Sequence, residues 1–229
     1  TKRNISQILN RGGKNMKEGE LLNSFLKRSV KRELKTDYIK ITNLNAAKNL
    51  QENILNVLNN NFTAIVYNFI DMLSHSRTEL DIIKQLAPDE KAYRSVTKSW
   101  FLNSPLWGAM QKLAEKDVNV VITTDHGTIR VKQPSKVLGD RETTANLRYK
   151  VGKNLQYDRK DVLEIRDPFE VGLPKPNVSS SFIFAKEDLY FLYPNNYNHF
   201  NNYYYDTFQH GGISMEEMIC PIIKMKPRN

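Results

Sequence analysis

Cysteine is nearly absent from the chain, which has only Cys220 among its 229 residues. A single cysteine excludes an internal disulfide framework and fits a reducing compartment, so we expect a cytoplasmic protein. Apolar runs are short, and none approaches the roughly 18 residues of a membrane helix, so we expect no membrane insertion. Acidic residues are the minority, 25 against 34 basic ones, and the net charge is +9. This balance favours polyanionic partners such as phosphates or nucleic acid.

Apolar periodicity alternates between helical and strand types along the first half of the chain, which predicts βαβ units and an α/β fold with a mainly parallel sheet. Helices are predicted over residues 17–35, 46–60, 77–86, 90–97 and 104–115. Strands are predicted over residues 38–41, 62–70, 118–124, 128–132, 182–186, 189–193 and 219–225. The two strands within 182–193 are expected to form a hairpin.

Three later segments have a different character. Residues 134–181 carry prolines at 134, 168, 174 and 176 and little periodicity, which predicts a cap or insertion over a site. Residues 195–205 are rich in Asn and Tyr and are expected to form a surface loop or an aromatic docking face. Ser214, followed by Glu216 and Glu217, predicts a helix N-cap with acids in the first turn.

An aspartate and a histidine stand side by side where a strongly apolar run, 118–122, ends. They are Asp125 and His126, within Thr123-Thr124-Asp125-His126-Gly127-Thr128. Ligands and catalytic groups gather at the carboxyl ends of strands in an α/β sheet. Asp oxygens and neutral His nitrogens are ligands that zinc accepts. The pair therefore predicts part of a metal site.

The other three histidines limit the search for further ligands. His75 lies four residues after Asp71, so a turn of helix or a tight loop would place both on one side. His210 precedes two glycines, which let the backbone pass close to an ion or phosphate. His199 has no such context and is expected in a surface or aromatic loop. Each residue, taken alone, is more often structural than a ligand.

Five acidic and histidine residues, in this order, resemble the metal-binding core of the alkaline phosphatase superfamily: Asp71, His75, Asp125, His126 and His210. Residues 123–131, 139–141 and 146–150 are similar, more narrowly, to the PglZ branch and within it to PorX-type response regulators of type IX secretion. The resemblance runs roughly from Lys17 to Lys226. It implies an alkaline-phosphatase-like α/β fold, with a mainly parallel central sheet flanked by helices.

The resemblance also implies two metal ions. Asp71, His75 and His210 would hold one, and Asp125 with His126 would hold the second, completed by an upstream Asp. Zinc suits this mixture of nitrogen and oxygen ligands, and manganese would be accepted by the same set.

Three basic residues after the Asp-His pair are expected to contact substrate phosphate oxygens: Arg141, Arg148 and Lys153. Arginine can do so through a bidentate fork, although surface salt bridges are an alternative role for all three.

The family's nucleophile, a Thr or Ser near a metal-binding Asp, is expected at the end of a first strand upstream of every element above. The chain starts at Thr1 in a polar, basic stretch, so no residue is assigned as nucleophile. We expect residues 1–229 to be the C-terminal portion of a PglZ-type effector domain without its receiver domain or first strand, and to be inactive alone.

Three functions follow from the resemblance. The first is a metal-dependent phosphodiesterase acting on oligonucleotides or cyclic nucleotides in the intact protein. The second is a non-catalytic signalling module with a structural metal, which binds secretion-motor or sigma-factor proteins through residues 195–205. The third is a phosphomonoesterase or phosphomutase with the same two-metal core. A homodimer is a possible partner state in any of these functions.

Overall fold

The computed structural model describes residues 17–30, 32–174, 177 and 179–227, apart from the side chains of His75 and Asp81. The chain divides into two compact units. Of the described residues, those within 17–72, 87–120 and 225–227 form the first unit, and those within 73–86 and 121–224 form the second. Within the described ranges, no helix has the length and apolarity that crossing a membrane requires.

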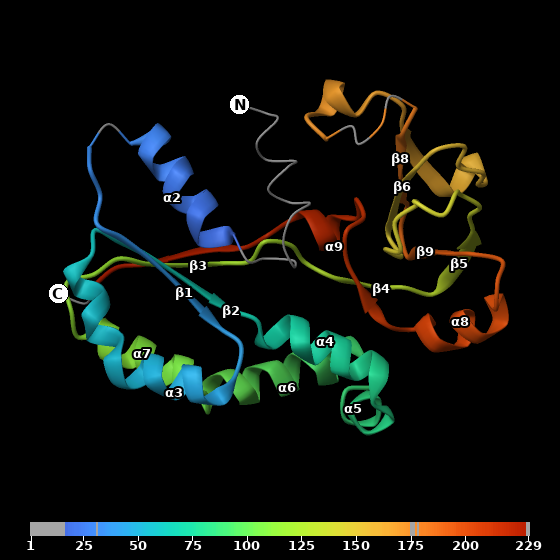
Figure 1. Cartoon of the computed structure of the whole chain (residues 1–229). Helices are drawn as coiled ribbons and strands as arrows, with labels where there is room; N and C mark the ends of the chain where they lie inside the picture. The colour runs from blue at the N-terminus through green and yellow to red at the C-terminus, as the bar shows by residue number, and fades with distance from the viewer. Residues whose placement is uncertain (1–16, 31, 175–176, 178, 228–229) are drawn as a thin grey trace. The chain divides into compact units, whose positions relative to one another are not determined.

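The first unit is built around two parallel strands. Its elements are α2 (Glu18–Ser29), β1 (Thr36–Ile41), α3 (Leu44–Asn53), the 3₁₀ helix η1 (Ile54–Asn59), β2 (Phe62–Tyr67), the start of α4 (Phe69–Glu79), α6 (Glu90–Leu102) and α7 (Pro105–Ala114). Figure 1 shows α3 and α7 on one side of the β1–β2 pair and α2 on the other. Strand β1 runs parallel to β2, with Ile41 opposite Tyr67. A βαβ connection therefore forms here as the periodicity predicts.

The core of the first unit lies between this pair of strands and its helices. The buried side chains are Ile41, Ala47, Leu50, Ile54, Ala109 and Leu113. At their N-termini the helices are fixed by short polar side chains: Asn43 caps α3, Asp89 caps α6 and Ser104 caps α7. Each cap accepts a hydrogen bond from a backbone N–H group that the first turn leaves without a partner.

The second unit consists of short strands joined by loops and small helices. Its elements are the rest of α4, α5 (Asp81–Leu86), β3 (Val120–Thr123, from its second residue), β4 (Ile129–Arg130), β5 (Gln133–Lys136), β6 (Tyr149–Gly152), η2 (Arg159–Asp161), β7 (Val162–Ile165), η3 (Pro168–Val171), β8 (Ser181–Ala185), β9 (Leu189–Leu192), α8 (Tyr197–Tyr204), β10 (Phe208–Gln209), α9 (Met215–Met218) and β11 (Ile222–Met225).

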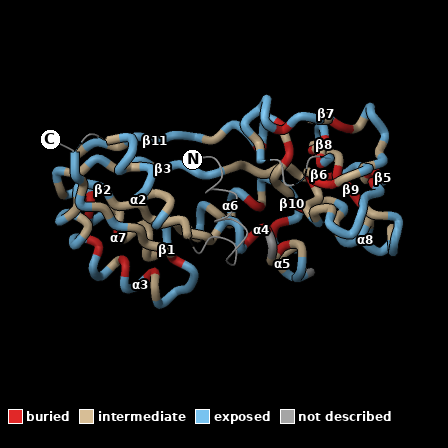
Figure 2. The backbone as a smooth tube through the Cα atoms, turned by 45° about the horizontal axis from the view of Figure 1, so that its top comes forward, coloured by how far each residue is buried: buried red, intermediate tan, exposed pale blue. Residues whose placement is uncertain are grey.

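A mainly parallel central sheet is not confirmed. The described strands form five small sheets: β1–β2, β4–β10, β3–β11, β5–β9 and β6–β8–β7. The β6–β8–β7 sheet is antiparallel, and it draws two of its strands from the proline-containing region 134–181. Most residues of β6, β8 and β9 are buried, as Figure 2 shows in red, whereas β11 is largely exposed. The cap predicted for 134–181 thus contains strands of its own, and its role over a site stays a prediction.

The hairpin predicted over 182–193 is wrong, because another segment lies between its two strands. Strand β8 joins β6 and β7, while β9 pairs in parallel with β5. The backbone N–H of Ala185 donates to the carbonyl of Arg148, and that of Phe191 donates to the carbonyl of Leu147, both at 2.8 Å. Residues 147–148 thus occupy hydrogen-bonding positions that a hairpin would fill across its own strands.

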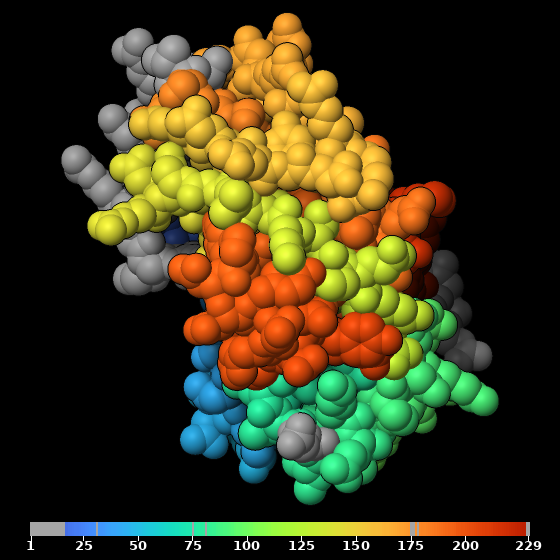
Figure 3. Space-filling view, turned by 90° about the vertical axis from the view of Figure 1, so that its right-hand side faces the viewer, coloured from blue at the N-terminus to red at the C-terminus, as the bar shows by residue number. Residues whose placement is uncertain are grey.

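Residues 195–205, expected as a loop, mostly form the helix α8. Contacts with the rest of the second unit stabilise this helix: Tyr190 donates a hydrogen bond to the Asn201 side chain at 2.6 Å, and Lys136 Nζ lies 4.7 Å from the Tyr197 ring centroid. Figure 3 shows α8, in orange, on the surface. His199 stacks on Tyr203, which confirms its aromatic surroundings, although in a helix. Tertiary packing therefore stabilises a helix here, although the helical pattern of the sequence is weak.

A buried lysine stabilises the turn that precedes β6. Lys150 is 1% exposed, and its ammonium group donates to the carbonyl oxygen of Thr144 at 3.1 Å. The same nitrogen lies 4.4 Å from the ring centroid of Tyr193, as a cation–π contact. Burial disfavours the charged form and lowers the pKa of Lys150 from 10.5 to about 8.

This lowered pKa predicts a pH-dependent stability. Between pH values of about 8 and 10.5 the unfolded chain keeps the Lys150 proton while the folded chain releases it, so this group makes the folded state more stable as pH rises. The gain across the window is about 3 kcal/mol. The Lys150→Met variant lacks this contribution, so urea unfolding from pH 7 to 10 should show its stability falling relative to the wild type as pH rises. Lys132→Met, at an exposed position, is the control. A stability difference for Lys150→Met that does not vary with pH would contradict the assignment.

Candidate metal centre

Asp125 and His126 follow β3 on a loop that local hydrogen bonds hold in place. The Thr124 hydroxyl donates to the His126 carbonyl at 2.8 Å, and the His126 N–H donates to the Asp125 carboxylate at 3.1 Å. The next N–H group, of Gly127, donates to the backbone carbonyl of Glu217 in α9 at 2.9 Å. The strand end is therefore attached to a helix ninety residues further along the chain, and the Asp-His pair has a defined position.

A short antiparallel ladder brings His210 to the same place. Strands β4 and β10 pair so that Gln209 lies opposite Ile129, which places His210 beside the loop that carries His126. The two imidazole rings stack with their centroids 3.8 Å apart and their planes 9° from parallel. Two of the predicted ligands, far apart in the sequence, are thus neighbours in the fold.

The donor atoms around His126 suit a divalent cation. Its Nδ1 lies 3.0 Å from the carbonyl oxygen of Gly127, and a hydrogen on Nδ1 would leave the Nε2 lone pair for a metal. The Asp125 carboxylate lies 3.7 Å from that Nε2 and is 86% exposed, while the His126 side chain is 33% exposed. An oxygen and a nitrogen donor therefore lie together at an open edge.

The second predicted pair lies on α4. Asp71 and His75 are one turn apart on this helix, as their spacing predicts, and Asp71 is exposed. The side chain of His75 lies outside the described part. Among the described side chains, no group of three or more His, Cys, Asp or Glu residues is gathered closely enough to hold a metal ion. The complete five-residue ligand set therefore stays a prediction.

Two arginines that the sequence reasoning overlooked lie beside β10. Arg77, which is 1% exposed and two residues beyond His75, donates to the backbone carbonyl of Asp206 at 2.7 Å. Its guanidinium lies 5.0 Å from the ring centroid of Phe208. Arg130 also pairs with the Asp206 carboxylate. These contacts hold the C-terminal half of α4 near β10, the strand that precedes His210. No sequence motif predicts them.

The structure corrects the role expected for Arg148. This residue is fully buried, and its guanidinium makes a bidentate pair with Glu217, with both nitrogen–oxygen distances at 2.9 Å. It also donates to the backbone carbonyls of Ala185, Glu187 and Leu189. Every guanidinium nitrogen is bound inside the protein, so Arg148 is a structural residue in this fold and not a surface contact for phosphate.

Glu217 is charged in spite of its burial. Burial alone would raise the pKa of its carboxyl group, but hydrogen bonds from Arg148 and its positive charge, together with the N–H group of Gly212 and the side chain of Ser214, hold that pKa below its usual value. Ser214 and Glu217 form a capping box at the start of α9, which confirms the predicted N-cap.

The other two basic candidates are placed on loops. Arg141 is exposed in the turn after Asp140, and Lys153 is half-buried in the turn that follows β6. Their contact with a substrate stays a prediction.

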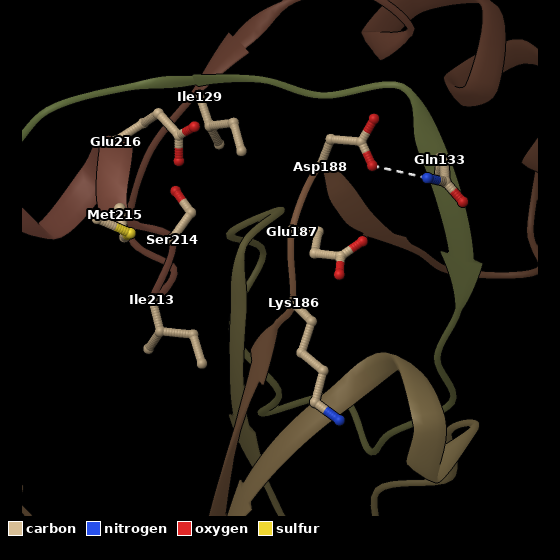
Figure 4. A pocket seen from close by; sticks show the side chains of 9 residues that line it. All are labelled: Ile129, Gln133, Lys186, Glu187, Asp188, Ile213, Ser214, Met215 and Glu216. Atoms are coloured by element: carbon tan, nitrogen blue, oxygen red, sulfur yellow. Dashed lines mark hydrogen bonds between the residues drawn. The ribbon is translucent and has the colours of Figure 1, made fainter.

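A cavity of about 670 Å³ lies beside α9, where Met215 and Glu216 face Lys186, Glu187 and Asp188. Figure 4 shows the α9 side chains on one wall and residues 186–188 with Gln133 on the other, where Gln133 donates to Asp188 at 2.8 Å. None of the five predicted metal ligands lines this cavity. Its lining carries both charge signs, so its chemistry is not specific to a phosphate.

Comparison with known proteins finds a match to one protein family. No curated protein matches the chain. The family described as "BREX system PglZ alkaline phosphatase-like domain" matches residues 7–225, nearly the whole sequence. Members of such a superfamily are phosphoesterase-type hydrolases that typically use metal ions. Because this match covers almost the full length of the sequence, the chain belongs to the PglZ alkaline phosphatase-like domain family.

Proposed function

We propose that this PglZ domain is the metal-binding part of a phosphodiesterase. The observation that carries the proposal is the stacked pair of His126 and His210, with the exposed Asp125 carboxylate beside it. Imidazole nitrogens and a carboxylate at an open strand end are the donor set that zinc or manganese accepts, so these residues fit the ions that the family implies.

The proposed ligands would bind two metal ions at separate positions. Asp125 and His126 would bind one ion, and His210 with Asp71 and His75 would bind the other. When bound, a pair of divalent ions supplies charge stabilisation to an in-line displacement at phosphorus and hydroxide at neutral pH. The nucleophile, a Thr or Ser, would come from the upstream strand that the family resemblance implies.

The class of substrate follows from charge. The chain carries a net charge of +9, which favours polyanions, and we expect phosphodiesters such as oligonucleotides or cyclic nucleotides. Arg141 and Lys153 are the remaining candidates for contacts with phosphate oxygens. The resemblance of residues 123–131 to PorX-type proteins adds the context of a response-regulator effector linked to type IX secretion.

A second function is a metal-stabilised interaction module. It is favoured by aromatic side chains exposed on and beside α8, where Phe200 is 37%, Tyr203 40% and Tyr205 50% exposed. Aromatic residues are enriched in protein interfaces, so this helix would bind a partner such as a secretion-motor or sigma-factor protein. A phosphomonoesterase with the same core is a third candidate.

Metal binding is tested with single histidine variants. His126→Ala or His210→Ala should lower zinc affinity by about two orders of magnitude, because each removes one of few ligands. Thermal stability in excess zinc should fall with it, since a ligand that binds only the folded state stabilises that state. Elemental analysis and calorimetry measure both quantities. His199→Ala, on α8, is the matched control and should bind zinc as the wild type does. Full metal content in both site variants would refute the ligand set.

Substrate class is tested with the chain joined to the nucleophile-bearing strand that the resemblance implies. The zinc-loaded protein should hydrolyse a bis(nitrophenyl) phosphodiester faster than the nitrophenyl monoester, and Asp125→Ala should reduce both rates by at least about a hundredfold. A preference for the monoester would favour the phosphomonoesterase. Bound zinc without hydrolysis of either ester would favour the interaction module.

A further inference from the structure

One buried carboxylate connects the segments that carry the two stacked histidines. Glu217, which is 3% exposed, accepts hydrogen bonds at Oε1 from the N–H of Gly212 and at Oε2 from the N–H of Ser214, at 2.9 and 3.1 Å. Its backbone carbonyl accepts from the N–H of Gly127 at 2.9 Å. Arg148 donates a hydrogen bond to each of the two carboxylate oxygens. We call these five residues the Glu217 junction.

Two residues of the junction lie close in sequence to a histidine. Gly127 directly follows His126, and Gly212 lies two residues after His210. Glu217 therefore binds both backbone segments, the one at Gly127 through its main-chain carbonyl and the one at Gly212 through its carboxylate. The distance between the imidazole rings depends on these two attachments together with the β4–β10 ladder.

The glycines are required by the close approach. A Cβ atom at Gly127 would lie 1.9 Å from the carbonyl oxygen of Glu216, and a Cβ atom at Gly212 would lie 2.7 Å from Glu217 Oε2 and 2.9 Å from Arg148 Nε. Both contacts are shorter than non-bonded atoms allow. The neighbour of Gly127 is backbone, and the neighbours of Gly212 are two side chains held in a buried ion pair. Any larger residue would therefore move a histidine-bearing segment away from the junction.

We propose that Glu217, held by Arg148, is a positioning residue that sets the stacking of His126 on His210 and thereby the geometry of the metal centre. It touches neither the metal nor a substrate in this role. The inference rests on the proposed function only in the purpose of the histidine pair, because the stack is a contact between two side chains of the chain itself. Outer residues that orient metal ligands commonly change metal affinity by about tenfold to a hundredfold.

The first measurement needs no metal. In proton NMR of the metal-free protein, the imidazole signals of His126 and His210 should carry mutual ring-current shifts and a cross-relaxation contact. Glu217→Gln should abolish both, because a neutral amide presents donor hydrogens to Arg148 and to the backbone N–H groups. Glu216→Gln, a neighbouring change on the exposed side of α9, should leave both unchanged. The signals of His199 report that the rest of the fold is intact.

A second variant keeps the inference testable if Glu217→Gln does not fold. Gly212→Ala retains both charges of the ion pair and displaces only the segment that carries His210. It should weaken the ring-current shifts in the same direction. Unchanged imidazole signals in the folded variants would overturn the positioning role.

Zinc titration against a chromophoric chelator separates this inference from the proposed function. Wild type and Glu216→Gln should bind equally, and Glu217→Gln about tenfold to a hundredfold more weakly. Equal zinc affinity in Glu217→Gln would overturn the positioning role. If the wild type binds no zinc while the imidazole signals respond as described, the positioning role stands and the proposed metal-dependent function fails.

Discussion

The second unit depends on one buried ion pair, Arg148 with Glu217. Both side chains are almost fully removed from solvent, and such a pair is tolerated only when its remaining hydrogen-bonding capacity is filled. Here the filling groups are backbone carbonyls on both sides of the β8–β9 connection and backbone N–H groups before α9. The pair therefore serves as a common anchor for segments that share no sheet.

The loop that carries Asp125 and His126 is attached to this anchor through the N–H of Gly127. Short strands such as β4 and β10, with two residues each, supply few ladder hydrogen bonds and would fix a loop weakly by themselves. The carboxylate of Glu217 adds charge-assisted bonds, which are stronger than neutral ones. The hydrogen bonds of Glu217 therefore help to fix the position of the loop that carries Asp125 and His126.

The sequence predicted the local features and missed the long-range ones. Helices α2, α3, α6 and α7, the parallel pair β1–β2 and the capping box at Ser214 follow from periodicity or from interactions within a few residues. The start of α4 was predicted as the end of a strand, 62–70, and is helical from Phe69. The insertion of residues 147–148 between β8 and β9 could not be predicted, because no local pattern encodes a third segment. For the same reason Arg148 was expected at the surface, since a basic residue in a loop carries no sign of a partner 69 residues later. The neighbourhood of His126 and His210 was expected from the family resemblance and not from spacing.

The separation of the two charges along the chain has a consequence for biosynthesis. Until Glu217 has been made, a growing chain contains Arg148 without its counter-ion, and closing the second unit around that guanidinium would bury an unpaired charge. The unit therefore cannot reach its final packing progressively during synthesis, in step with each new strand. It stays open until α9 is added, and the histidine pair forms in the same late event. A chain interrupted before α9 would be left as an open target for proteolysis.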